Sequence, residues 1–202
     1  MNPSRRQVLL GAAVVLPLAL ALGACTPEPP PPAQSLPQIS FAHRPEIRLT
    51  VGDIETVRAF TPTGQAPHIE HAVPIAPVTV VESWIRDRLR AAGGIGFARA
   101  TIVDASMTET ALKTDQSITG IFKTQQARKI AARVEVRIDV ETNGSGNGFV
   151  TAIVMRDQTL PENLTLQQRD EALIAFVEAL GRDLDARLES EITGNLTGFL
   201  AP

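Results

Sequence analysis

The sequence has 202 residues, of which 44% are hydrophobic, 4% are aromatic and 20% are charged. This length suits one domain with an N-terminal targeting segment, and the hydrophobic content is enough to bury a core of aliphatic side chains. The formal net charge of −3 does not attract nucleic acid, so nucleic-acid binding is not expected. The single cysteine, Cys25, excludes an internal disulfide and a multi-cysteine metal site.

The N-terminus is organised as a secretory signal. Arg5 and Arg6 form a basic head, and the apolar segment 8–24 is slightly short for a membrane-spanning helix and typical of a signal peptide. The stretch SRRQVLL at residues 4–10 is similar to the twin-arginine export signal, although it departs from that signal at two positions. A Sec signal that carries two arginines is the alternative, and the sequence leaves the export route open.

Four residues at the end of this segment resemble the bacterial lipobox: Leu22, Gly23, Ala24 and Cys25. The resemblance implies that signal peptidase II cuts before Cys25, that a diacylglycerol is attached to its sulfur, and that a fatty acid such as palmitate caps the new amino group. Because two or more acyl chains hold a protein stably on a bilayer, we expect a membrane-anchored lipoprotein. In the enterobacterial sorting rule, Asp after the cysteine retains a lipoprotein in the inner membrane, so Thr26 favours the outer membrane.

Prolines dominate the segment that follows the cysteine. This composition favours an extended polyproline II spacer that cannot pair into a sheet, and a linker of no set length is the alternative. The chain is therefore predicted to contain a signal peptide at 1–24, a lipidated, proline-rich tether at 25–45, and a single periplasmic domain at 46–202.

The domain is predicted to open with a strand over 46–58 that is broken where its apolar alternation changes phase. A proline-rich loop and a helix over 78–92 follow. Thr79 and Glu82 have the spacing of a capping box at the start of this helix. Trp84, the only tryptophan, lies on its apolar stripe and is interpreted as a core anchor.

Three strands are predicted in the middle of the domain. The first covers 98–107, and the polar stretch 108–127 after it is ambiguous. Over 129–141 apolar and charged residues alternate. This pattern predicts an antiparallel sheet with one buried and one solvent-exposed face, and it favours cross-strand ion pairs on the exposed face. The sequence NGSGNG at 143–148 predicts a hairpin turn. The return strand, 149–156, is apolar on both faces and is predicted to be central.

A final helix is predicted from Thr165, which forms a capping box with Gln168, to about Thr193. The element order is β-α-β-β-β-α. The predicted fold class is α+β, with an antiparallel sheet of about four strands and two helices packed on one face.

This order, behind a lipobox and a tether, resembles two groups of small Gram-negative envelope lipoproteins: the LPS-assembly lipoprotein and the auxiliary lipoproteins of ABC-type transport systems. The stretch VESWIRDRLRAAGG at 81–94, the glycine-turn hairpin and the long C-terminal helix carry the likeness, which is architectural and covers most of residues 46–200. The resemblance implies a non-catalytic accessory or assembly subunit of an envelope complex, with lipid transport as one role. It identifies no binding residues.

Candidate chemistry is sparse. In the stretch HIEH, the side chains of His68, Glu70 and His71 could ligate zinc or copper. However, Pro67 and Pro74 bound the segment, so no helix presents both imidazoles on one face, and an exposed polar loop is the preferred interpretation. We therefore expect no catalytic residue, metal or cofactor. A lipid or small-ligand binding module, and a metal-binding protein or enzyme that uses His68 and His71, stand as alternatives.

Overall fold

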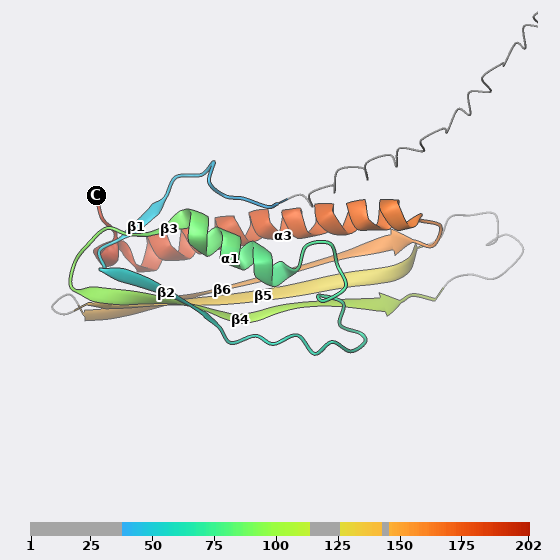
Figure 1. Ribbon diagram of the computed structural model, residues 1–202, viewed down its shortest axis with the longest axis horizontal. Helices are drawn as coiled ribbons and strands as arrows, with labels where there is room; N and C mark the ends of the chain where they lie inside the picture. Colours follow the sequence, from blue (N-terminus) through green and yellow to red (C-terminus); the bar gives the residue numbers. More distant parts are fainter. Residues whose placement is uncertain (1–37, 114–125, 143–145) are drawn as a thin grey trace, which may run out of the picture. The chain divides into compact units, whose positions relative to one another are not determined.

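The computed structural model describes residues 38–113, 126–142 and 146–202 (Figure 1). The predicted export and lipidation residues therefore lie outside the described part: Arg5, Arg6, Leu22, Gly23, Ala24 and Cys25. The same holds for most of the tether, for the tip of the predicted hairpin and for much of the ambiguous stretch 108–127. The predictions made for these residues stay predictions.

The described elements follow the predicted order, with two short additional strands. They are β1 (Ile47–Leu49), β2 (Asp53–Arg58), α1 (Pro77–Arg88), β3 (Leu89–Ala91), β4 (Gly96–Ala111), β5 (Gln126–Thr142), β6 (Gly146–Pro161), α3 (Leu166–Asn195) and the 3₁₀ helix η1 (Thr197–Phe199). The main sheet has the strand order β2-β4-β5-β6, and β1 pairs with β3 in a separate two-stranded sheet. The α+β class is thus confirmed, and the predicted first strand is broken between β1 and β2.

The main sheet is mixed, which corrects the prediction of a wholly antiparallel sheet. β4 pairs antiparallel with β5, and β5 pairs antiparallel with β6. β2, however, runs parallel to β4, with Asp53 opposite Phe97 and Arg58 opposite Ile102. The physical reason is the crossover through α1, because a helix between two neighbouring strands returns the chain in the same direction.

Helix α1 differs from the prediction at both ends. Its N-cap is Ala76, whose side chain forms no cap, and a proline occupies the first turn, where a missing N–H costs nothing. The predicted capping box is therefore wrong: Thr79 lies within the helix, and Glu82 instead binds Arg58 of β2. The C-terminal end comes earlier than predicted, because the chain after Arg88 becomes extended and pairs with β1.

Strand β6 lies at the edge of the sheet, so its predicted central position is wrong. It bonds to β5 alone among the described strands. Its outward row is apolar although it is not buried: Phe149, Ile153 and Met155 are 59%, 44% and 69% exposed. Apolar residues on both faces of β6 therefore do not mark a strand that is covered on both sides.

Both helices cover one face of the main sheet (Figure 1). Alternate residues of β5 point into this layer, as predicted, and are buried: Ile130, Ala132, Val134, Val136, Ile138 and Val140. Trp84 of α1 is 0% exposed within the same core. The predicted capping box of Thr165 and Gln168 is present at the start of α3. In the described ranges, no helix combines the length and apolarity needed to cross a membrane.

Candidate functional site

Residues 38–45, called the strap below, cross the outside of the helix layer. The Phe41 ring is 4% exposed. Asp87 of α1 accepts hydrogen bonds from the Phe41 N–H and the Ser40 hydroxyl, both at 2.8 Å. On α3, Gly181 allows the close approach, because a Cβ there would lie 3.0 Å from Val80 of α1 and 3.3 Å from Phe41. Packed chain therefore begins before residue 46, within the predicted tether.

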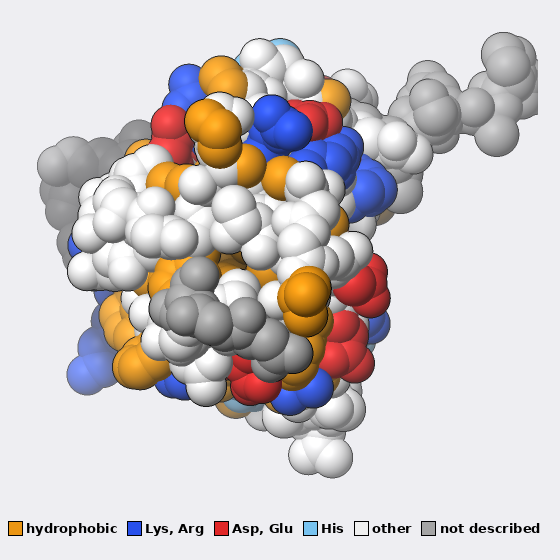
Figure 2. Space-filling view, turned by 90° about the vertical axis from the view of Figure 1, so that its left-hand side faces the viewer, with side chains coloured by type: hydrophobic (Ala, Val, Ile, Leu, Met, Phe, Trp, Pro, Cys, Tyr) orange, Lys and Arg blue, Asp and Glu red, His pale blue; other side chains and the backbone are white. Residues whose placement is uncertain are grey.

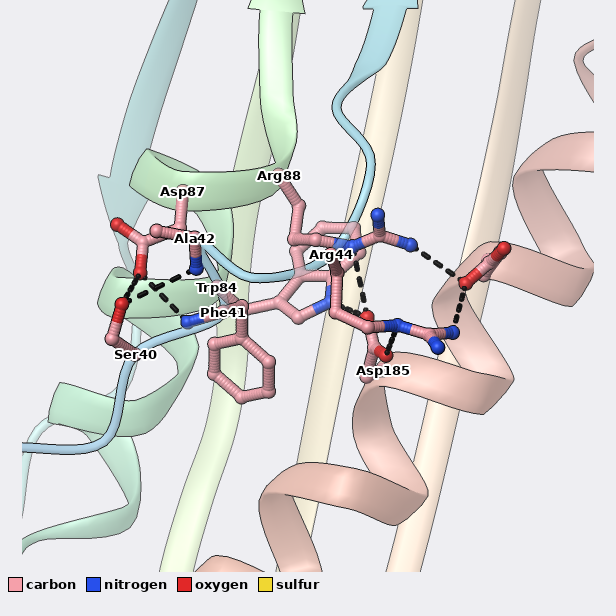
Figure 3. A network of polar contacts seen from close by, with 9 residues as sticks. Ser40, Phe41, Ala42, Arg44, Trp84, Asp87, Arg88 and Asp185 are labelled. Atoms are coloured by element: carbon pink, nitrogen blue, oxygen red, sulfur yellow. Dashed lines mark hydrogen bonds and ion pairs between the residues drawn. The ribbon is translucent and has the colours of Figure 1, made fainter.

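A partly buried ionic network joins the strap to both helices (Figure 3). Asp185 of α3 accepts hydrogen bonds from the Trp84 indole at 2.8 Å and from Arg88 Nε at 2.9 Å. Arg44 of the strap lies 3.1 Å from the same carboxylate, and both arginines also bind Glu189. The hydrogen bond to Glu189 and the charge of Asp185 raise the Arg44 pKa. This network is structural, because Arg88 is 1% exposed and closed to a substrate.

The segment HIEH closes the free edge of β4. The Ile69 N–H donates to the Met107 carbonyl oxygen at 2.8 Å. The buried Glu70 carboxylate accepts the Met107 N–H at 3.3 Å, and His68 Nδ1 lies 3.6 Å from the same carboxylate. His71 is exposed. Among the residues that the structure describes, no three His, Cys, Asp or Glu side chains form a group that could hold a metal ion.

The face of the main sheet opposite the helices, called the outer face below, is not packed against any described helix or strand. Its middle strand, β5, carries charges that are paired within the face. Arg133 binds Glu135 at 2.5 Å along the strand and Asp104 of β4 at 2.8 Å across it, and Arg137 binds Asp139 at 2.6 Å. The predicted cross-strand pairing is thus confirmed for Arg133, whereas the Arg137 pair is within one strand.

Hydrogen bonds to these carboxylates stabilise the charged form of both arginines. The Asp104 and Glu135 carboxylates raise the Arg133 pKa, and the Asp139 carboxylate raises the Arg137 pKa. The charges of β5 therefore largely cancel in place. A partner that covers this face need not supply a strong opposite charge.

Apolar side chains flank the charged strand on the outer face. On β6 they are Phe149, Ile153 and Met155, and on β4 they are Phe97 and Val103, which are 37% and 39% exposed. The Arg137 guanidinium carbon lies 4.0 Å from the Phe149 ring centre, a cation–π contact. Figure 2 shows hydrophobic side chains around the hairpin at one end of the molecule. Aromatic, Met and Arg side chains are enriched in protein interfaces, so the outer face is the candidate functional site.

Sequence reasoning placed these residues differently. The strand 149–156 was predicted to be central in the sheet, and Phe41 and Arg44 were assigned to the tether. The predicted metal candidates His68 and Glu70 come together, whereas His71 is exposed to solvent. A single aromatic residue after the proline run, Phe41, was the available signal for the strap.

The fold and the outer face together define a two-layer α+β domain with one uncovered sheet face. The sequence matches no known protein-family model and has no significant match among curated proteins. Among solved structures, it is similar to rare lipoprotein B from Shewanella oneidensis, with 15% identity, coverage of 70% of this chain and 94% of that chain, and a TM-score of 0.36.

Two further solved structures are similar. A minor lipoprotein from Acinetobacter baumannii has 8% identity, coverage of 74% of this chain and 96% of that chain, and a TM-score of 0.38. A protein from Xanthomonas campestris, of a family named as one of unknown function, has 12% identity, coverage of 74% and 88%, and a TM-score of 0.32. Two of the three are named lipoproteins. At these low identities and scores, the likenesses assign no family, site or role.

Proposed function

We propose that this protein is a lipid-anchored, non-catalytic accessory subunit of a bacterial envelope complex, and that it contacts its partner through the outer face. The main supporting observation is the contrast between the two faces of the sheet. The helix layer is closed by the strap and by the Asp185 network, whereas the outer face exposes an apolar row beside charges that are already paired. Because these charges already have partners within the face, a protein partner that covers it would leave no isolated buried charge.

The anchor is proposed to be a lipid on Cys25, with Thr26 directing the protein to the outer membrane and the domain facing the periplasm. The sequence of the lipobox supports this assignment. Replacing Cys25 with alanine should abolish incorporation of labelled palmitate and release the protein from the membrane fraction. As a matched control, Thr26→Asp should keep the label and move the protein toward the inner membrane. A labelled, membrane-bound Cys25→Ala protein would contradict the proposal.

A non-catalytic role is supported by how the described buried polar groups are used. Arg88 and Asp185 join the two helices, and Glu70 holds the edge of β4. The alternative of a ligand site between the helices and the sheet is disfavoured, because that space is filled by side chains that include Trp84 and Phe176, which are 0% and 1% exposed.

The docking surface can be tested with a photo-crosslinking amino acid in native membranes. Placed at Val103, on the outer face and away from the edge strand β6, it should crosslink to a second protein. The matched control is Glu178, an exposed position on the helix α3, which should give little product. Equal crosslinking from the two positions, or no partner from Val103, would contradict the use of the outer face.

A further inference from the structure

The outer face contains a hollow toward the end of the sheet away from the hairpin, and Ala131 of β5 lies in it. Ala131 is opposite Thr108 of β4 and Asp157 of β6. Along β5, the neighbouring residues on the same face are Lys129 and Arg133, each about 7 Å away. A single methyl group therefore lies between two long side chains, and the cavity that it lines has a volume of about 260 Å³.

The size of this hollow suits one side chain of another protein. Pockets for small-molecule ligands usually hold about 300–1,000 Å³ and enclose most of the ligand. The hollow is smaller than this range, and it opens on the sheet face that no described helix or strand covers. In protein interfaces, a few side chains that fill such pockets carry most of the binding energy. The hollow therefore fits an anchor residue of a protein partner better than a free ligand.

The charged groups beside the hollow already have partners. Lys129 Nζ lies 3.1 Å from Asp157. Two carboxylates, those of Asp104 and Glu135, bind Arg133 at 2.8 Å and 2.5 Å. A charged side chain from a partner would lose its hydration here and find no unpaired opposite charge among these groups, which is costly. The occupant is therefore expected to be neutral.

The guanidinium group beside the hollow favours an aromatic occupant. Elsewhere on the same face, the Arg137 guanidinium carbon lies 4.0 Å from the Phe149 ring centre, although Arg137 is also bound to a carboxylate. Arg133 is bound to carboxylates in the same way, so it can contact a ring of a partner and keep its ion pairs. An aliphatic side chain has no comparable attraction to a cation.

The sulfur atom of Met155 favours the same occupant. Met155 lines the hollow, lies opposite Arg133 and is 69% exposed. Sulfur–aromatic contacts are favourable, and the flexible methionine side chain adapts to the shape of a ring. Because Met155 also ends the exposed apolar row of β6, a ring in the hollow would extend that row.

We infer that the hollow at Ala131 receives an aromatic side chain of the envelope partner. This inference rests on the proposed function, because it names the residue type by which a partner is anchored on the outer face. The ring lies over the Ala131 methyl group, between the Arg133 guanidinium and the Met155 sulfur atom.

Filling the hollow tests the inference with the full-length protein in native membranes. Ala131→Leu places a larger side chain in the hollow, and Ala131→Ser is the matched control because it adds only one oxygen atom. The photo-crosslinking amino acid is placed at Val103, which does not line the hollow. Ala131→Leu should lower the yield of the partner crosslink about tenfold or more, and Ala131→Ser should change it less than about twofold. Far-UV circular dichroism of the purified proteins verifies folding.

A second measurement identifies the occupant without altering Ala131. A short photo-crosslinking amino acid at Met155 should attach to the partner, and mass spectrometry should place the bond at or beside an aromatic residue. Changing that residue of the partner to leucine should lower the crosslink from Val103, whereas changing it to another aromatic residue should preserve the crosslink.

The outcomes separate the inference from the proposed function. Equal crosslinking of Ala131→Leu and Ala131→Ser to a partner from Val103 would overturn the inference and leave the proposed function standing. A contact mapped from Met155 to a segment without an aromatic residue would do the same. The absence of any partner from Val103 in the otherwise wild-type protein would overturn both.

Discussion

Replacing Asp185 with alanine is expected to destabilise the domain by about 4 kcal/mol. The carboxylate is buried and receives hydrogen bonds from the Trp84 indole at 2.8 Å and from Arg88 at 2.9 Å. Removing one partner of a buried ion pair costs about 3–5 kcal/mol, and an unpaired buried N–H about 1–3 kcal/mol. In the variant, Glu189 still binds Arg88 at 2.6 Å and compensates part of the lost ion pair. The expected loss is therefore smaller than the sum of the two costs.

The assay is urea unfolding of the purified protein. Trp84 is the only tryptophan and is fully buried, so its fluorescence reports the loss of the helix–sheet core. Agreement with far-UV circular dichroism would verify a two-state transition. The matched control is Asp183→Ala, because Asp183 lies on the same helix but forms only an exposed ion pair with Arg156; it should cost less than about 1 kcal/mol. A similar, small effect of Asp185→Ala would refute the reasoning.

A second variant tests the cause of the loss. If the unpaired charge of Arg88 is responsible, then Arg88→Met combined with Asp185→Leu should recover most of the stability, because it removes both buried charges and fills their volume. Equal instability of this double variant and of Asp185→Ala would show that the lost Trp84 hydrogen bond, and not the stranded charge, sets the cost.

Two further predictions concern the strap and the start of β4. Burial acts to raise the Asp87 pKa, but hydrogen bonds led by the Phe41 N–H hold it below its ordinary value. Stabilisation from a lowered pKa is present above the unfolded-state pKa and lost as the pH falls through the folded-state pKa. Proteolysis of the strap should thus increase in acid, and Asp87→Asn should be cleaved readily at neutral pH; protection equal to wild type would contradict this. Gly96 has φ +150°, and a Cβ there would overlap the Glu141 carbonyl oxygen. Gly96→Ala should therefore lower the thermal midpoint strongly, whereas the control Gly194→Ala, where a Cβ meets open space, should not. Equal midpoints for the two variants would argue against the pairing of β4 with β5 at Gly96.

The sequence by itself determined the features that depend on neighbouring residues. The alternation over 129–141 predicted the buried and the solvent-exposed faces of β5, and Thr165 with Gln168 predicted the start of α3. The order of the main elements and the α+β class also followed. These signals are local, because side-chain periodicity and capping hydrogen bonds involve residues only a few positions apart.

Only the tertiary structure decided which elements are neighbours and which surfaces stay open. It placed β6 at an edge, made β2 parallel to β4, and brought Asp185 to Trp84 across 101 positions of the chain. It also turned Phe41 from an apparent tether residue into part of the core. Burial and pairing of this kind depend on the packing of segments far apart in sequence, and an apolar residue on a strand looks the same whether its face is covered or exposed.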